Sequence, residues 1–195
     1  MSKDAQGNDL SAVRIPVTGK FAWAPLDPDN VVTAADGGDR SFALTEDYPA
    51  YKILGLRKKD GGVERTAETN EQLEFFEDGF KLAGDPTHKF KVAIAESSRD
   101  NIEFIYGLEF DKNHHAYVGD AFRTGQFLGY LETLFRNGDI ERNNGVCQIV
   151  SVAEDKDERG RAKGIALEVE WMSSPLFDGK KYSRWSIPSA IPDPS

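Results

Sequence analysis

The chain has 195 residues and a mass of 21.6 kDa, and its 33 acidic and 24 basic side chains give a formal net charge of -9. Hydrophobic residues make up 39% of the sequence and aromatic residues 11%, which suffices for a core and excludes wholesale disorder. No stretch approaches the roughly 18 to 20 apolar residues of a membrane span. The first residues lack the apolar segment of a secretory signal, so we expect neither a signal nor a membrane partner.

The acidic balance argues against a protein that grips nucleic acid, because such a surface needs clustered lysine and arginine to displace counterions. The only short basic cluster, Arg57-Lys58-Lys59, is followed at once by Asp60. A negative surface does not exclude proximity to DNA. It would repel phosphate and let DNA pass without adhering.

In chain order, residues 1–12 are small and polar and predict a frayed N-terminal arm. The alternation that follows predicts a short strand, a turn at Thr18-Gly19 and a second strand, with Pro16 favouring a sheet edge. The segment from about 25 to 50 begins rich in proline, glycine and aspartate. We expect it to form a long exposed loop, and loops of this length usually have a function.

The pair Asp60-Gly61 predicts a hairpin, and the acidic residues 64–78 predict a strand that gives way to a short helical or irregular piece. Residues 88–95 alternate between apolar and polar side chains and predict a half-buried strand. A capping-box spacing at Ser97 and Asp100, with a glycine C-cap, predicts one short α-helix over about 97–106.

Three further strands are predicted over about 127–135, 146–152 and 165–171. The stretches Asn137-Gly138 and Asn143-Asn144-Gly145 predict turns, because asparagine and glycine favour turn conformations. The tail from about 173 to 195 carries four prolines and predicts an extended arm. No internal repeat is evident, so the sequence predicts a single, mainly β domain over residues 1–195.

Motifs for nucleotide or calcium chemistry are incomplete. Residues 79–84 begin like a phosphate-binding loop, but Asp85 stands where the lysine is needed. The stretch 155–160 resembles a calcium loop, but Arg159 occupies a ligand position and Ala166 the place of the bidentate glutamate.

Residues that could carry metal or nucleophilic chemistry are few. Adjacent His114 and His115 would point to opposite faces of a strand, so we interpret them as part of a polar loop. Cys147 lies in an apolar run, and we interpret it as a core residue that cannot form an internal disulfide. By elimination, the sequence predicts neither an enzyme nor a bound cofactor or metal.

Four patterns follow one another in the first half of the chain. They are Val13 to Pro25 with its Val17-Thr18-Gly19, Leu54-Gly55 leading to Asp60-Gly61-Gly62-Val63, Phe75-Phe76 before Asp78-Gly79, and the strand Phe90 to Glu96 that runs into Tyr106-Gly107. In this order the patterns resemble the major tail proteins, or tail tube proteins, of long-tailed, non-contractile phages, especially those of actinobacteria. The extra Gly62, and Phe75-Phe76 where a tryptophan often stands, depart from the family pattern.

The resemblance implies a β-sandwich or barrel-like tail-tube fold with a flanking helix. It implies six copies in a ring, whose inner hairpins join into one continuous β-barrel, and rings that stack into a tube for DNA ejection into the host. The expected partners are other copies of the chain, a tape-measure protein, a tail terminator and passing DNA, bound without sequence specificity. The expected location is the virion tail, assembled in the host bacterial cytoplasm.

Two sets of side chains are candidates under this resemblance, and an ordinary solvated face is the alternative for each of them. The carboxylates that would line the channel are Glu64, Glu68, Glu71, Glu74, Glu168 and Glu170. The side chains that would contact the next ring are Asp27, Asp29, Asp36, Arg40 and Trp185.

Other functions remain open at the level of sequence. A tail terminator, or another tube or ring protein of a contractile or secretion-type machine, would share the fold, so the sequence separates these functions poorly. A different class is a monomeric β-barrel that binds a small ligand or carbohydrate, with Trp23, Trp171 and Trp185 as its platform. The alternative for these tryptophans is packing within the fold.

Overall fold

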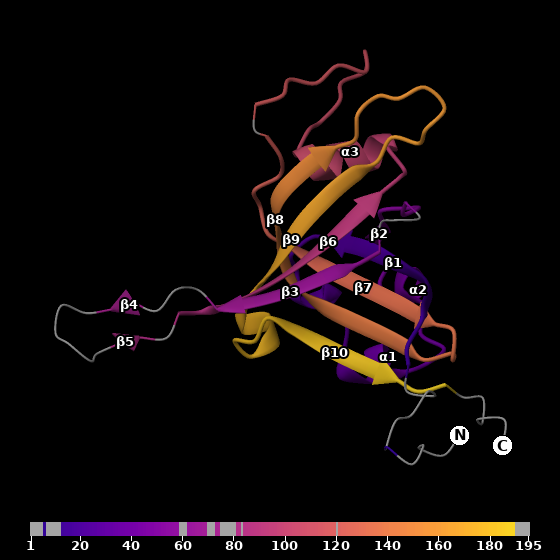
Figure 1. Ribbon diagram of the computed structural model, residues 1–195. Helices are drawn as coiled ribbons and strands as arrows, with labels where there is room; N and C mark the ends of the chain where they lie inside the picture. Colours follow the sequence, from indigo (N-terminus) through magenta and orange to yellow (C-terminus); the bar gives the residue numbers. More distant parts are fainter. Residues whose placement is uncertain are drawn as a thin grey trace. The chain divides into compact units, whose positions relative to one another are not determined.

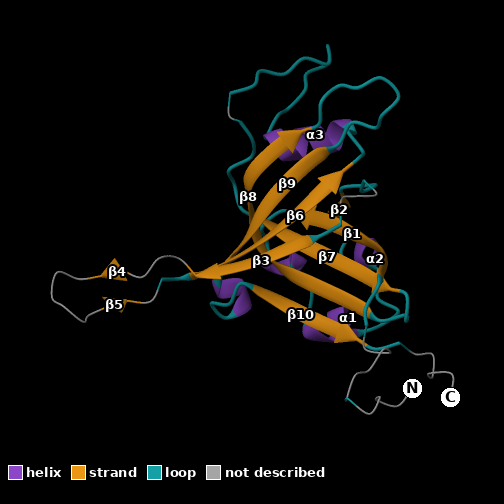
Figure 2. Ribbon diagram, in the orientation of Figure 1, coloured by secondary structure: helices purple, strands orange, loops and turns teal. Residues whose placement is uncertain are grey.

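The computed structural model describes residues 6, 13–58, 62–69, 73–74, 81–82, 84–119 and 121–189 (Figures 1 and 2). Strands dominate and the helices are short, so the prediction of a mainly β fold is confirmed. The chain divides into two compact units. Unit 1 comprises Met1–Leu54, Phe127–Gly145 and Ser174–Ser195, and unit 2 comprises Gly55–Gln126 and Val146–Ser173.

Eight strands pair in the order β2-β1-β7-β8-β9-β6-β3, with β10 also paired to β8. The strands of unit 1 are β1 (Pro16–Ala24), β2 (Lys52–Ile53), β7 (Phe127–Phe135), β10 (Tyr182–Ile187) and the first part of β8 (Ile140–Glu154). Those of unit 2 are β3 (Glu64–Thr69), β6 (Pro86–Ile94), β9 (Ile165–Met172) and the rest of β8. A separate pair is formed by β4 (Leu73–Glu74) and β5 (Lys81–Leu82). Because β8 contributes to both units, they are not successive domains, and the single domain over 1–195 stays a prediction.

The helices are η2 (Pro28–Asn30), α1 (Ala34–Gly38), α2 (Leu44–Asp47), α3 (Arg99–Tyr106) and η3 (Pro175–Phe177). The predicted helix over 97–106 is therefore confirmed as α3, whose C-cap is Gly107 with φ 64°. Its N-cap is Ser98, whose hydroxyl accepts from the amide of Asn101, and not the expected Ser97. The segment from about 25 to 50 joins β1 to β2 and contains three of the short helices, none of which was predicted.

Several local predictions were wrong because long-range pairing overrides local preference. Thr18 and Gly19 do not turn; they lie inside β1 opposite Leu134 and Thr133. The stretch Asn143-Asn144-Gly145 lies inside β8 and pairs with β10.

The remaining local predictions are confirmed in some places, wrong in others, or lie outside the described residues. The Asn137-Gly138 turn is present, with φ 84° at the glycine. Leu73 and Glu74 form a strand and no helical piece. The tail is extended over β10, where it joins the sheet. The Asp60-Gly61 hairpin lies outside the described residues, as does the N-terminal arm apart from Gln6.

The core of unit 1 is organised around a buried arginine. Arg142, on β8, is only 2% exposed. Its Nε donates to Glu132 at 2.8 Å, and its Nη1 donates to the backbone carbonyls of Gly37, at 3.0 Å, and Asp39. Its guanidinium also lies 5.2 Å from the ring centroid of Phe42. The charge is thereby compensated on all sides, as a buried guanidinium requires.

A buried asparagine, two residues after Arg142 on β8, also binds the segment between β1 and β2. Asn144 is fully buried, and its side-chain oxygen accepts from the amide of Val32 at 3.1 Å. Its side-chain nitrogen donates to the Tyr51 hydroxyl at 2.7 Å and to the carbonyl of Gly129 at 2.9 Å. Two side chains of β8 therefore hold the segment between β1 and β2 against the sheet of unit 1.

Unit 2 has an apolar core on one face of its sheet. The alternating residues of β6 and β9 that face this core are Phe90, Val92, Ile94, Ile165, Leu167, Val169 and Trp171, each at most 4% exposed. The rings of Phe90 and Trp171 pack in a tilted arrangement, with centroids 5.1 Å apart and an interplanar angle of 39°. The strand predicted over 88–95 is therefore confirmed, and the opposite face of the same strands is left to polar side chains.

Replacing Arg142 by methionine should lower the free energy of unfolding by about 3–5 kcal/mol, because Glu132 and two carbonyls lose their buried donor. Urea titration of the wild-type and variant chains measures this. Arg159→Met, at an exposed position, is the matched control and should change stability little. An equally small loss for Arg142→Met would show that the guanidinium does not organise the unit.

Glu132 should make the free energy of unfolding depend on pH in the acidic range. Burial acts to raise its pKa, but the hydrogen bond from Tyr130, the Lys20 ammonium and the Arg142 guanidinium outweigh burial, so the pKa lies below the ordinary 4.5. The ionised carboxylate therefore contributes stability above pH 4.5, and this contribution is lost as the pH falls below that value.

Glu132→Gln should lower the unfolding free energy at neutral pH, and its difference from wild type should shrink at pH values below 4.5. Urea titrations across this range measure the difference. Glu46→Gln, at an exposed carboxylate, should follow the wild-type pH dependence. A constant difference for Glu132→Gln at every pH would contradict the assignment.

Candidate functional site

The polar face of the unit 2 sheet gathers charged side chains from three strands. We call it the charged face, and it consists of Glu64, Glu68, Lys89, Lys91, Glu168 and Glu170. Directly opposite residues of antiparallel strands point to the same side of a sheet. Glu64 lies opposite Lys91, and Lys91 lies opposite Glu168, while Lys89 lies opposite Glu170. Lys91 therefore stands between carboxylates from both neighbouring strands, whereas Lys89 has Glu170 opposite it on β9 and Thr66 opposite it on β3.

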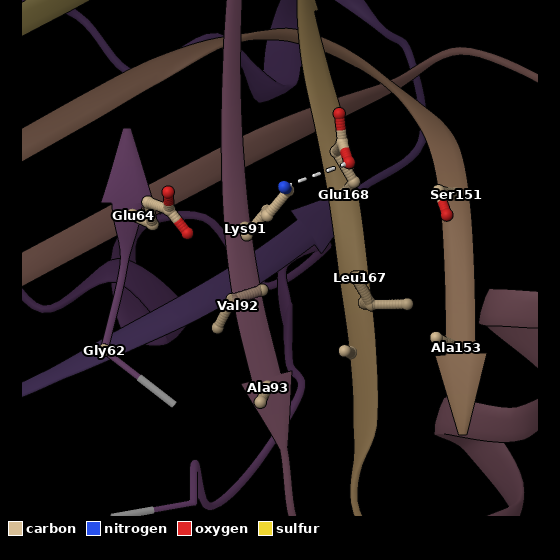
Figure 3. Close-up of a pocket in the computed structure, with 10 residues that line it drawn as sticks. Gly62, Glu64, Lys91, Val92, Ala93, Ser151, Ala153, Leu167 and Glu168 are labelled. Atoms are coloured by element: carbon tan, nitrogen blue, oxygen red, sulfur yellow. Dashed lines mark ion pairs between the residues drawn. The ribbon is translucent and has the colours of Figure 1, made fainter. Parts of the chain in front are cut away.

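The ion pairs on this face are loose and partly exposed. The Nζ atoms of Lys89 and Lys91 lie 3.7 and 3.6 Å from the two carboxylate oxygens of Glu168, whose side chain is 25% exposed. Figure 3 shows Lys91 reaching from β6 between Glu64 on β3 and Glu168 on β9. Exposed pairs at such distances contribute little to stability. The carboxylates outnumber the lysines by four to two, so the face keeps an excess of negative charge.

A shallow depression of about 250 Å³ lies on the same side of the sheet (Figure 3). Small side chains line it where Ala93, Ala153 and Ala166 stand opposite one another on β6, β8 and β9. Ser151 supplies the only hydroxyl among its described lining residues, which include no histidine or cysteine.

Four of the six candidate channel carboxylates are brought together here, from segments about 100 residues apart. Glu64 and Glu68 are exposed on β3, and Glu168 and Glu170 are half-buried on β9. Glu71 lies outside the described residues, and Glu74 belongs to the separate β4–β5 pair. Lys89 and Lys91 were not among the candidates, although their alternation with apolar residues already placed them on the polar side of a strand.

The candidate residues for contacts between rings lie in unit 1, where most of them form hydrogen bonds within their own chain. Asp27 caps η2 by accepting from the amide of Asp29 at 2.9 Å. Asp36 accepts from the hydroxyls of Tyr48 and Thr33, each at 2.7 Å, and these hydrogen bonds lower the pKa of Asp36.

The other two candidates bind backbone of the same unit. Arg40 donates to the carbonyls of Pro188 and Gly138, at 2.9 and 2.6 Å. The indole of Trp185 donates to the carbonyl of Ala34 at 3.1 Å. A contact of these five residues with another copy stays a prediction.

The three tryptophans do not form the platform that a carbohydrate module would need. Trp171 is 4% exposed inside the core of unit 2. The indole of Trp185 packs so closely over α1 that a Cβ at Gly37 would lie 2.3 Å from it. Trp23 has the Lys52 ammonium 5.7 Å from its ring centroid. Trp171 and Trp185 therefore act as packing residues.

The remaining candidate residues, a cysteine and two histidines, form no metal site in the part of the chain that is described. Cys147 is buried, as expected of a core residue, and His114 and His115 lie in an exposed loop. No group of three or more His, Cys, Asp or Glu side chains among the described residues is placed to hold a metal ion. No helix in the described ranges is long and apolar enough to cross a membrane.

No protein-family model matches the chain, and no curated protein is similar to it. Among solved structures, a chain in the sixfold-symmetrised cryo-EM structure of the anti-feeding prophage (AFP) baseplate superposes with a TM-score of 0.37 and 11% sequence identity. The superposition covers 92% of this chain and 100% of that chain. A likeness at this level identifies neither a family nor a function, so we infer the function from the residues themselves.

The charged face should be dispensable for folding. Glu168→Gln should change the free energy of unfolding by less than about 1 kcal/mol, because its ion pairs are exposed. Val169→Ala, one residue along the same strand but fully buried, should cost about 1–3 kcal/mol. Urea titration compares the two variants. A large loss for Glu168→Gln would mean that the face serves the fold.

Proposed function

We propose that the chain is a structural virion protein that forms hexameric rings, and that these rings stack into the tail tube through which phage DNA is ejected. The observation that carries the proposal is the gathering of Glu64, Glu68, Glu168 and Glu170 on one face of one sheet. In the ring this face lines the channel. Its excess of carboxylates repels the phosphates of passing DNA, which lowers adhesion during ejection.

The sheet of unit 2 also has the open edge that ring formation requires. In the described strands, β3 has a ladder partner on one side only, namely β6. An open edge is a hazard of aggregation in a monomer, and pairing with the next copy removes it. Closing six such sheets on one another gives a continuous barrel without edges.

The ordered patterns between Val13 and Gly107 supply the family to which this proposal refers. Within that proposal, the tape-measure protein and the tail terminator are the expected partners. Stacking of rings is a heterologous contact that does not close, so it generates a tube of many rings. The chain would then act in the tail of the virion after assembly in the bacterial cytoplasm.

Two alternatives differ in what they predict for assembly. A tail terminator would form one ring and stop. A monomeric carbohydrate-binding module would form no ring, and the burial of Trp171 removes one member of the platform proposed for it.

Negative-stain electron microscopy of the purified chain, with size-exclusion chromatography alongside, tests the proposal. Rings with a central hole that stack into tubes are expected. Single rings at every concentration would favour the terminator. A chain that stays monomeric when concentrated and seeded with tails would contradict ring formation altogether.

The role of the charged face is tested in the same tubes. A variant with Glu64, Glu68, Glu168 and Glu170 all changed to glutamine should retain more double-stranded DNA than wild-type tubes, because the repulsion is reduced. The matched control changes Glu46, Asp85, Glu109 and Asp178, all exposed and in neither candidate set, to their amides and removes the same charge. Equal retention by both variants would show that the face does not line the channel.

A further inference from the structure

The chain contains two Asn-Gly pairs, and the structure places them in different surroundings. Asn137 lies in the turn between β7 and β8 with its side chain exposed, and Gly138 follows it with φ 84°. Asn144 lies fully buried inside β8, where its side chain makes three hydrogen bonds. Gly145 is paired with Tyr182 of β10. The two pairs therefore share a local sequence but differ in their access to solvent and in their freedom to change conformation.

An asparagine that precedes a glycine can react without an enzyme. The backbone nitrogen of the glycine loses its proton and attacks the side-chain carbonyl carbon of the asparagine. The bond from this carbon to the side-chain nitrogen breaks, and the nitrogen takes up a proton and leaves as ammonia. Water then opens the cyclic imide at one of its two carbonyls and gives aspartate or isoaspartate. Glycine favours the attack because it has no Cβ to hinder the approach of its nitrogen.

We propose that Asn137 is a site of this spontaneous deamidation in the folded protein, and that Asn144 is not. The amide of Gly138 donates to the carbonyl of Phe135 at 2.9 Å, so the attack requires the turn to open. An exposed turn opens at a small cost in free energy. Freeing Asn144 requires the opening of strands that form the core of unit 1, which costs much more.

The same turn holds both terminal segments of unit 1 through the carboxylate of Asp139. Its Oδ1 accepts from the amide of Ser189, after β10, at 2.9 Å. Its Oδ2 lies 3.3 Å from the Nε of Arg14, before β1. Asn137 supports this carboxylate: its side-chain nitrogen donates to the Oδ2 of Asp139 at 3.0 Å, and its side-chain oxygen accepts from the amide of Asp139 at 3.1 Å.

Backbone groups of the turn bind the same two segments. The amide of Arg136 donates to the carbonyl of Ile15 at 2.8 Å. Arg40 donates to the carbonyl of Gly138 at 2.6 Å and to that of Pro188 at 2.9 Å. A change in the shape of the turn therefore acts on the segment before β1 and on the segment after β10 together.

Conversion of Asn137 should loosen both segments. A carboxylate in place of the amide loses the hydrogen bond to Asp139 and places a second negative charge beside it, and the two charges repel each other. Isoaspartate also adds a carbon atom to the backbone path of the turn. The reaction is thus a slow change with the age of the molecule that weakens the attachment of both chain ends. It follows from the contacts of unit 1 and does not depend on the tail-tube function.

Peptide mass spectrometry of the folded chain, incubated at mildly alkaline pH, tests the site. Conversion at Asn137 should be at least about tenfold faster than at Asn144, because only the turn opens readily. In chains unfolded by urea the two pairs should convert at similar rates. Asn137→Gln, which forms the cyclic imide far more slowly, should abolish conversion at the turn. Equal rates at the two asparagines of the folded chain, or conversion of Asn137 only after unfolding, would overturn the proposal.

Hydrogen exchange of single amides, followed by NMR, tests the consequence in Asn137→Asp, which carries one of the two products from the start. Exchange at Ser189 and Arg136 should be roughly five- to tenfold faster than in wild type, because the hydrogen bonds of both amides are weakened. Unchanged exchange at both amides would show that conversion does not loosen the chain ends.

Asn113→Asp is the matched control for the exchange measurement. Asn113 is exposed in the loop of unit 2 between α3 and β7, and its side-chain nitrogen also donates to an aspartate two positions away, Asp111, at 3.4 Å. The variant therefore introduces the same charge beside a carboxylate in another part of the chain. Exchange at Ser189 and Arg136 should stay at the wild-type rate. Equally fast exchange in both variants would mean that the added charge acts on the whole chain and not through the turn.

Discussion

The structure of unit 1 depends on the requirement that a buried guanidinium be fully compensated. Arg142 has no access to water, so it must find its acceptors inside the protein. It takes them from Glu132 on β7 and from the backbone of the segment between β1 and β2. The short helices of that segment therefore have a defined place, although they are too short to be stable by themselves. Asp36 and Trp185, two of the residues proposed for contacts with other copies, belong to this arrangement.

The sequence was informative where a pattern depends on neighbours in the chain. Alternation predicted the strand over 88–95, and the glycine at 107 together with the preceding polar cap predicted α3. The same alternation placed Glu168 and Glu170 on one side of their strand. That they share a face with Glu64 follows from the pairing of β3 with β6 and of β6 with β9, which no local pattern contains.

Where the predictions failed, a distant partner decided the conformation. Asn143-Asn144-Gly145 has the composition of a turn, yet Asn144 is held inside β8 by hydrogen bonds to residues 15 to 112 positions away. Val13, Ile15 and Val17 have the pattern of a core strand, yet Arg14 finds its partners around Asp139 and Ser186 and turns them outward. A hydrophobic pattern indicates which residues lie on the same side of a strand. The hydrogen-bond and ion-pair partners decide which of the two sides is exposed to solvent.

The order in which the strands pair has a consequence for synthesis on the ribosome. Unit 1 is completed by β10, which ends at Ile187, and unit 2 by β9, which ends at Met172. Neither unit can close until its last strand has left the exit tunnel. Contacts between residues so distant in sequence also form slowly. A chain truncated by proteolysis or premature termination before β9 therefore lacks the last strand of each unit and cannot enter an assembly as a defective but folded subunit.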